Sequence, residues 1–186
     1  IVSILVASIA IASGVQVAFM APTEILASQQ FNSFKQQLDK IKIPCAQLMG
    51  KMSKKMRTPI IDGIKSGDIP IIIGTHALIQ KDVKFNNLGL VIVDEQHRFG
   101  VDQRASLIEK GFNPHFLAMT ATPIPRTLSI TYHGDMDISI LDEKPSNRIP
   151  IRTKVVEPSR LEKVYEFIKK EVNSGYQCMI IYPLVE

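Results

Sequence analysis

The sequence predicts an α/β fold in which helices cover both faces of a mainly parallel sheet. Short apolar runs alternate with helix-like segments, and this alternation is typical of parallel strands joined by helical crossovers. The predicted strands are residues 15–20, 44–49, 69–73, 90–93 and 116–119. The predicted helices are residues 23–40, 53–66, 101–110 and 124–132. The composition, with 45% hydrophobic and 22% charged residues, is ordinary for a globular protein.

The first twenty residues carry no charge. Their length suits a membrane span, but Gly14 interrupts the run, and no basic segment precedes it as in a signal peptide. We therefore predict a helix over residues 1–13 and a strand from residue 15. A helix that is apolar on every side is buried, and the Ala-Pro-Thr-Glu at 21–24 favours burial in protein over burial in lipid.

The carboxyl part of the chain has the pattern of a second unit. Residues 142–150 are rich in proline, asparagine and charge, which is typical of a linker. The pattern then predicts a strand over 151–156, an amphipathic helix over 159–173 and a buried strand over 176–182. We therefore predict a first domain of residues 1–143, a linker of residues 144–150 and the start of a second domain at 151–186.

The net charge and the cysteine content limit the kinds of binding partner and the redox environment that are expected for this chain. A net charge of +4 permits a polyanionic partner without requiring one. The absence of tryptophan argues against base stacking as the main binding device. Cys45 and Cys178 lie far apart and have no CxxC or histidine spacing. We therefore expect two core thiols in a reducing, cytoplasmic environment, with neither a disulfide nor a zinc site.

Two acids at the end of a predicted strand are the strongest functional signal. Asp94 and Glu95 directly follow the apolar run at 91–93, and open α/β sheets bind ligands at the edge where parallel strands end. Such a pair suits a site for Mg²⁺ and a nucleoside triphosphate, in which one acid holds the water shell of the metal and the other orients the attacking water. The alternative is a strand end with two solvated acids.

Hydroxyl side chains follow three other predicted strands. Thr23 begins the first long helix after a strand, Thr75 follows the third strand, and Thr120 and Thr122 follow the fifth. A hydroxyl and free backbone N–H groups at a helix start can hold a phosphate. Taken singly, each site has a simpler explanation as a helix cap or a Ser/Thr turn. Polar side chains that follow four strands, at the edge where parallel strands end, together favour one shared site.

A phosphate loop of the form GxxxxGK[ST] is absent from these 186 residues. The nearest match, at 50–53, has Cys45 in place of the first glycine and Met52 in place of the hydroxyl residue. We expect a solvated loop, with phosphate contact as the alternative, for the basic side chains of Lys51, Lys54, Lys55 and Arg57.

Together these motifs resemble the first motor domain of superfamily-two helicases, which carries an Asp-Glu-x-His box and a Ser/Thr-Ala-Thr motif in this order. The likeness is closest to the RecG family of branched-DNA translocases. It rests on GTHALI at 74–79, DEQHRFGVDQR at 94–104, MTATPIPRTL at 119–128 and the acidic segment at 135–145. The transcription-repair coupling translocase Mfd shares the third motif but usually carries Glu where this chain has Gln96, so it is the alternative within the class.

The resemblance implies a RecA-like fold and a role for each residue of the crevice. Asp94 would bind Mg²⁺ through its water shell, and Glu95 would be the base that orients the attacking water. Gln96 and His97 would sense the γ-phosphate and link it to the Thr-Ala-Thr motif. The hydroxyls of the Thr-Ala-Thr motif would then couple hydrolysis to domain movement. That motif supplies Thr120 and Thr122, and the DNA contacts would come from Thr23, Thr75, Arg98 and Arg126.

By the same resemblance, the protein would be a monomeric ATP-dependent helicase, with ATP and Mg²⁺, that remodels stalled replication forks and Holliday junctions. The alternatives are a translocase of the Mfd type and a non-catalytic nucleic-acid-binding module with the same fold. Compared with the family pattern, the sequence lacks the wedge domain, the phosphate loop and most of the second motor domain. We therefore expect little ATPase activity from these 186 residues alone.

Overall fold

The computed structural model describes residues 1–122, 136–143 and 148–182, so the helix expected at 124–132 lies outside the described residues. The chain divides into two compact units, Ile1–Gly134 and Asp135–Glu186. The division falls a few residues before the linker expected from the sequence, and the domain boundary at residue 143 stays a prediction.

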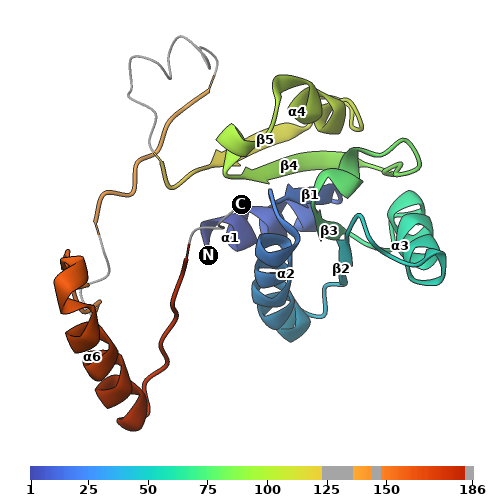
Figure 1. Ribbon diagram of the computed structural model, residues 1–186. Helices are drawn as coiled ribbons and strands as arrows, with labels where there is room; N and C mark the ends of the chain where they lie inside the picture. Colours follow the sequence, from blue (N-terminus) through green and yellow to red (C-terminus); the bar gives the residue numbers. More distant parts are fainter. Residues whose placement is uncertain (123–135, 144–147, 183–186) are drawn as a thin grey trace. The chain divides into compact units, whose positions relative to one another are not determined.

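A five-stranded parallel sheet forms the centre of the first unit (Figure 1), in the order β2-β3-β1-β4-β5. The strands are β1 (Gln16–Met20), β2 (Cys45–Leu48), β3 (Ile71–Gly74), β4 (Leu88–Asp94) and β5 (His115–Met119). Each of them overlaps one of the predicted strands. β1 lies at the centre and is buried along its whole length, which explains its apolar sequence.

Helices cover both faces of this sheet, as predicted. They are α1 (Val2–Ala12), α2 (Glu24–Leu38), α3 (Lys54–Ser66) and α4 (Val101–Ile108). α1 and α2 share one apolar cluster with Val17 and Phe19 of β1, whereas α3 and α4 share the other with Ala18 and Met20. Alternate residues of the central strand thus face opposite helix layers. The ring of Phe19 meets that of Phe34 of α2 edge to face, with centroids 5.3 Å apart.

One polar side chain fixes the start of the central strand. Gln16 is 4% exposed, and its amide nitrogen donates to the backbone oxygens of Ile64 and Ile69, both at 2.9 Å. Its oxygen accepts from the backbone N–H groups of Asn86 and Asn87, at 2.8 and 3.0 Å. Gln16 therefore ties β1 to the end of α3 and to the loop before β4.

The first helix differs from its prediction. α1 packs on the sheet through Ala7, which is fully buried. Its opposite side exposes Val2, Leu5 and Ile9, with exposed fractions of 55%, 58% and 68%. The expected burial on every side is therefore wrong, because a helix laid on a sheet buries only the side that faces it. Among the described helices, none is long and apolar enough to cross a membrane.

The second unit contains the expected helix but not the expected strands. α6 (Leu161–Asn173) follows a short 3₁₀ turn at Pro158–Arg160. The segments 151–156 and 176–182 form no strand and are exposed to solvent. A strand needs a partner to pair its backbone groups, and the described part of this unit offers none. Cys178 lies in the second of these segments and is exposed, whereas Cys45 is half-buried, so the expectation of two core thiols is wrong for Cys178.

Candidate functional site

Strand register brings the two motif-bearing loops together. β4 pairs with β5 so that Asp94 lies beside Met119. The residues that follow, Glu95 and Thr120, therefore leave the sheet next to each other at its carboxyl edge. The sheet grows from β1 in both directions, with β3 on one side and β4 on the other. Such a switch point is where open α/β sheets bind ligands.

Four polar side chains from these two loops contact one another. The Thr120 Oγ1 atom lies 3.1 Å from Glu95 Oε2, 3.1 Å from Thr122 Oγ1 and 3.4 Å from His97 Nδ1. His97 Nδ1 lies 3.4 Å from Glu95 Oε2 and 3.5 Å from Thr122 Oγ1. The Thr120 hydroxyl has a single proton, and the ionised Glu95 carboxylate is the strongest acceptor in reach. The hydroxyl therefore donates to Glu95 and accepts from the backbone N–H of Thr122, at 3.2 Å.

The backbone at Glu95 has a conformation that is uncommon for a residue with a side chain. Its φ of 50° and ψ of 53° lie in the left-handed region, which costs a non-glycine residue about 1–3 kcal/mol. The 3₁₀ turn Gln96–Arg98 follows at once, and its Arg98 N–H donates to the Glu95 carbonyl at 2.8 Å. Strained conformations of this kind concentrate at functional sites.

Asp94, like Glu95, is half-buried. Burial raises the pKa of its carboxyl, and the Glu95 charge raises it further. Two hydrogen bonds act in the opposite direction, one with the Glu95 backbone and one from the Gln30 side chain. The Gln30 Nε2 atom donates to Asp94 Oδ2 at 3.4 Å. A cation bound at the Asp94 carboxylate would likewise favour its ionised form.

The other residues of the acidic box divide between interior and surface. Gln96 is 7% exposed. His97 and Arg98 are exposed on the same turn. Arg126 lies outside the described residues. The predicted roles of Gln96 and His97 in sensing phosphate, and of Arg98 and Arg126 in binding DNA, stay predictions.

The two outlying threonines differ in exposure. Thr23 is exposed and caps α2, because its Oγ1 accepts the Leu26 N–H at 3.2 Å. Thr75 is 2% exposed, and its hydroxyl has no hydrogen-bond partner among the described residues. It follows Gly74, where any side chain would collide with the Leu48 carbonyl. The predicted DNA contact stays a prediction for both, and the hydroxyl of Thr75 faces the protein interior here.

The basic side chains of the segment that resembles a phosphate loop are exposed at Lys51, Lys54 and Lys55. Only Lys51 lies in a loop, as expected, because Lys54, Lys55 and Arg57 belong to the first turn of α3. Arg57 differs from the lysines because its guanidinium pairs with both oxygens of Asp82, at 3.1 and 2.9 Å, and donates to Gln80 at 2.7 Å. This pairing satisfies the Arg57 charge within the protein.

Sequence reasoning missed Gln30. It lies three residues after Ala27 and four before Phe34, both of which are fully buried, and so it continues the core-facing stripe of α2. A polar residue on such a stripe signals a buried partner. The partner could not be named from the sequence, since Asp94 lies 64 positions away along the chain.

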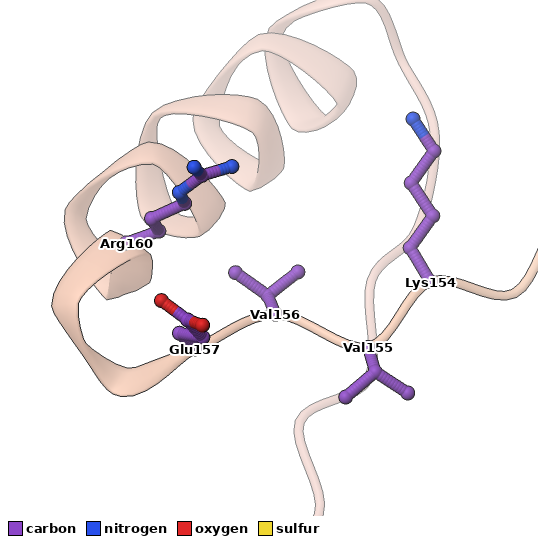
Figure 2. A pocket seen from close by; sticks show the side chains of 5 residues that line it. All are labelled: Lys154, Val155, Val156, Glu157 and Arg160. Carbon is purple, nitrogen blue, oxygen red and sulfur yellow. The ribbon is translucent and has the colours of Figure 1, made fainter.

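The donors present fit Mg²⁺ bound together with phosphate. Among the described residues, no three His, Cys, Asp or Glu side chains gather in a way that would hold a metal ion by themselves. Mg²⁺ usually takes only one or two carboxylates and completes its shell with water and phosphate, and Asp94 with Glu95 meets that requirement. The open pocket in Figure 2 belongs to the second unit and is lined by Lys154, Val155, Val156, Glu157 and Arg160, none of which is a predicted site residue.

Comparison with known proteins agrees with the motifs. The profile of DEAD/DEAH box helicases matches residues 2–130. The chain is 47% identical to the ATP-dependent DNA helicase RecG of Synechocystis sp. over 95% of its own length and 21% of that relative. It is 48% identical to the RecG helicase of Bacillus subtilis over 95% of its own length and 26% of that relative. The chain thus spans about a quarter of the length of such relatives.

Solved structures give the same result. The structure of RecG bound to a three-way DNA junction matches 92% of this chain, and 23% of that chain, with a TM-score of 0.74 and 44% identity. The DUF1998 helicase MrfA bound to DNA and AMPPNP matches 89% of this chain and 27% of that chain, with a TM-score of 0.62 and 20% identity, a likeness that shows the fold alone. The chain therefore belongs to the DEAD/DEAH box helicase family, in its RecG branch.

Proposed function

We propose that this site hydrolyses ATP with Mg²⁺ and that the released energy remodels branched DNA, including stalled replication forks and Holliday junctions. The observation that carries the proposal is the hydrogen bond from the Thr120 hydroxyl to the Glu95 carboxylate. This hydrogen bond joins the acid that is expected to act in hydrolysis to the Thr-Ala-Thr motif, which is expected to couple hydrolysis to domain movement. The identity to RecG relatives supports this branch over the Mfd alternative.

The two acids have separate tasks in this proposal. Asp94 holds Mg²⁺ through the metal's water shell, and the ion when bound neutralises charge that develops on the phosphates. Glu95 orients the attacking water and takes its proton. Hydrogen bonding to Thr120 keeps the Glu95 carboxylate in one rotamer, which lowers the entropic cost of orienting that water.

The contacts between the two loops supply the coupling. A proton gained by Glu95 removes its charge, and a neutral carboxyl is a weaker acceptor for Thr120. The His97 ring contacts the Glu95 carboxylate and the hydroxyls of Thr120 and Thr122. In this proposal, a change in the hydrogen bonding of Glu95 therefore also changes the hydrogen bonds of His97 and the two threonines. The threonine loop continues toward the second unit along the chain, and its displacement is how hydrolysis moves DNA in this proposal.

The DNA side of the proposal rests on exposed groups at the carboxyl edge. Thr23 at the start of α2 and Arg98 are exposed and suit phosphate contacts, which position a protein on DNA without reading its sequence. Thr75 and Arg126 complete the proposed set. The proposal includes a monomer that acts in the cytoplasm on branched DNA, and the likeness to a RecG structure with a three-way junction supports that substrate.

The test is the substitution equivalent to Glu95→Gln in a full-length RecG relative. We expect ATP hydrolysis to fall by about 10³-fold or more, because the substitution removes the base but keeps the size and a hydrogen-bond partner for Thr120. Binding of ATP and of a three-way junction should be retained. Steady-state phosphate release checks the loss of hydrolysis, and junction binding measured on the same preparation checks that DNA binding is retained.

The matched variant is Thr120→Ala with Thr122→Ala. Because these hydroxyls couple and do not react, hydrolysis should persist while fork regression fails. Normal hydrolysis by Glu95→Gln would refute the role of the acid. Equal loss of both activities in the threonine variant would refute the division of roles between the two loops.

A further inference from the structure

The contact between Gln30 and Asp94 joins two elements that no helicase motif described above links. Gln30 belongs to α2, which follows the central strand, and Asp94 ends the neighbouring strand β4. The Gln30 Nε2 atom lies 3.4 Å from Asp94 Oδ2. Gln30 is half-buried, and its contact with Asp94 is partly shielded from solvent.

The helix that carries Gln30 is held firmly on both sides of it. Ala27 and Phe34 are fully buried one turn before and one turn after. Ser28 Oγ accepts a hydrogen bond from Gln47 of β2 at 3.0 Å. The stretch of α2 around Gln30 is therefore fixed against the sheet, and this places the amide within reach of the Asp94 carboxylate.

We propose that Gln30 is a positioning residue for the metal-binding carboxylate, which it holds by Oδ2 so that the other oxygen faces the water shell of the ion. This inference rests on the proposed function, because Asp94 matters in this way only if it holds Mg²⁺. The chemistry suits the task. A neutral amide donor orients a carboxylate without cancelling the charge that attracts the cation, as a lysine or arginine would.

A purely structural role for the amide makes a different prediction. In that case the removal of the hydrogen bond would weaken the fold and leave metal binding at Asp94 unchanged in the folded protein. In the positioning role, the fold is retained and metal binding weakens. The residue next to it provides the control, since Gln29 is the same residue type on the same helix but is exposed.

The experiment uses the 186-residue chain with Mn²⁺ as the probe in place of Mg²⁺. Paramagnetic broadening of the backbone amide signals of residues 94–97 during a Mn²⁺ titration gives an apparent Kd at this site. The variants are Gln30→Met, which keeps an unbranched chain without a donor, and Gln30→Asn, which keeps the amide but shortens its reach. We expect the Kd to rise about tenfold in both, since loss of an outer-shell partner typically weakens metal affinity by that factor or more.

Gln29→Met should bind Mn²⁺ as the unsubstituted chain does and should unfold at the same temperature as Gln30→Met. An unchanged Kd in Gln30→Met and Gln30→Asn would overturn the inference. The variant Asp94→Asn separates this failure from failure of the proposed function. If Asp94→Asn retains the broadening, Asp94 does not hold the metal and the proposed function loses its metal site. If Asp94→Asn loses it while both Gln30 variants do not, only the positioning role is wrong.

Discussion

At the scale of single residues, Asp94 and Glu95 show that candidate site residues can lower the stability of the fold. Two neighbouring carboxylates are held at a sheet edge, one of them half-buried and the other in a left-handed backbone conformation. Burial at Asp94 and the backbone conformation at Glu95 each raise the free energy of the folded state. Among the described residues, Asp94 has hydrogen bonds but no ion pair to offset its burial. Such costs are expected where charge must be kept available for a ligand.

The Asp94 carboxyl makes the stability of the fold depend on pH. Its pKa is raised above the ordinary value of 3.8, so the folded state binds this proton more readily than the unfolded state does. The carboxyl therefore opposes folding at neutral pH, and stability is regained as the pH falls through the raised pKa toward 3.8. We predict that Asp94→Asn increases the free energy of unfolding at pH 7 and that the gain disappears at acidic pH.

Urea unfolding of the chain at a series of pH values measures this difference. Asp62→Asn is the matched control, because Asp62 is exposed on α3 and its substitution should leave the free energy of unfolding unchanged. A loss of stability on Asp94→Asn at pH 7 would show that Asp94 supports the fold, contrary to the burial argument.

The two cysteines should differ sharply in reactivity. Burial is the main cause that raises the pKa of the Cys45 thiol to about 12, and only the thiolate reacts with maleimide. Cys178 is exposed. At pH 8 we predict that one equivalent of maleimide is taken up rapidly, at Cys178, and that Cys45 reacts only after denaturation. Mass spectrometry of the labelled chain identifies the site, and Cys178→Ser should then take up no label. Rapid labelling of Cys45 in the native chain would contradict the prediction.

At the scale of elements, Gln16 is where the central strand is joined to its neighbours. Four backbone groups depend on its side chain. Gln16→Leu would leave them without this partner in a buried setting, where one unsatisfied group costs about 1–3 kcal/mol. We predict a loss of about 3 kcal/mol in the free energy of unfolding, since relaxation and water recover part of the total. Gln29→Leu, on an exposed position, is the control, and a loss below about 0.5 kcal/mol for Gln16→Leu would place it among ordinary surface substitutions.

The elements also show which parts of the fold the sequence could predict. The five strands were predictable because each falls in a short apolar run between two helix-like segments. β1 and β3 are buried along their whole length, whereas the edge strands β2 and β5 are only partly buried. The runs at 151–156 and 176–182 look the same but form no strand among the described residues, because pairing depends on a neighbour that lies outside the run itself. α1 was predicted as a helix but not with an exposed side, since uniform apolarity does not tell which side meets the sheet.

The candidate site also contains contacts that the sequence could predict and contacts that it could not. The contact of Thr120 with Glu95 was predictable, because parallel neighbouring strands bring these two loops to one edge of the sheet. The contacts of His97 with Thr120 and Thr122 agree with the link that the resemblance implied. The Gln30 contact was not predictable, because it depends on where α2 lies on the sheet relative to the end of β4. The burial of Thr75 was likewise missed, since a hydroxyl after a strand has the same sequence pattern whether it faces solvent or the core.

At the scale of the whole molecule, the chain carries the acids of a nucleotide site without the loop that usually cradles the phosphates. No GxxxxGK[ST] motif occurs in the 186 residues, and in helicases of this fold class the backbone N–H groups and lysine of that loop hold the transferred phosphate. In the proposed function, the half-site described here orients water and holds a metal ion. It supplies few contacts that bind the triphosphate itself.

We therefore predict that the 186-residue chain turns over ATP at least about 10³-fold more slowly than a full-length RecG relative, with or without a three-way DNA junction. The reason is that positioning of the phosphates supplies most of the rate in phosphoryl transfer. Phosphate release measured at saturating Mg²⁺ and ATP checks the rate. The Glu95→Gln chain, purified in parallel, gives the background from contaminating ATPases. Turnover of about 1–100 per second that vanishes in Glu95→Gln would contradict the prediction, since it would mean that other residues of this chain cradle the phosphates.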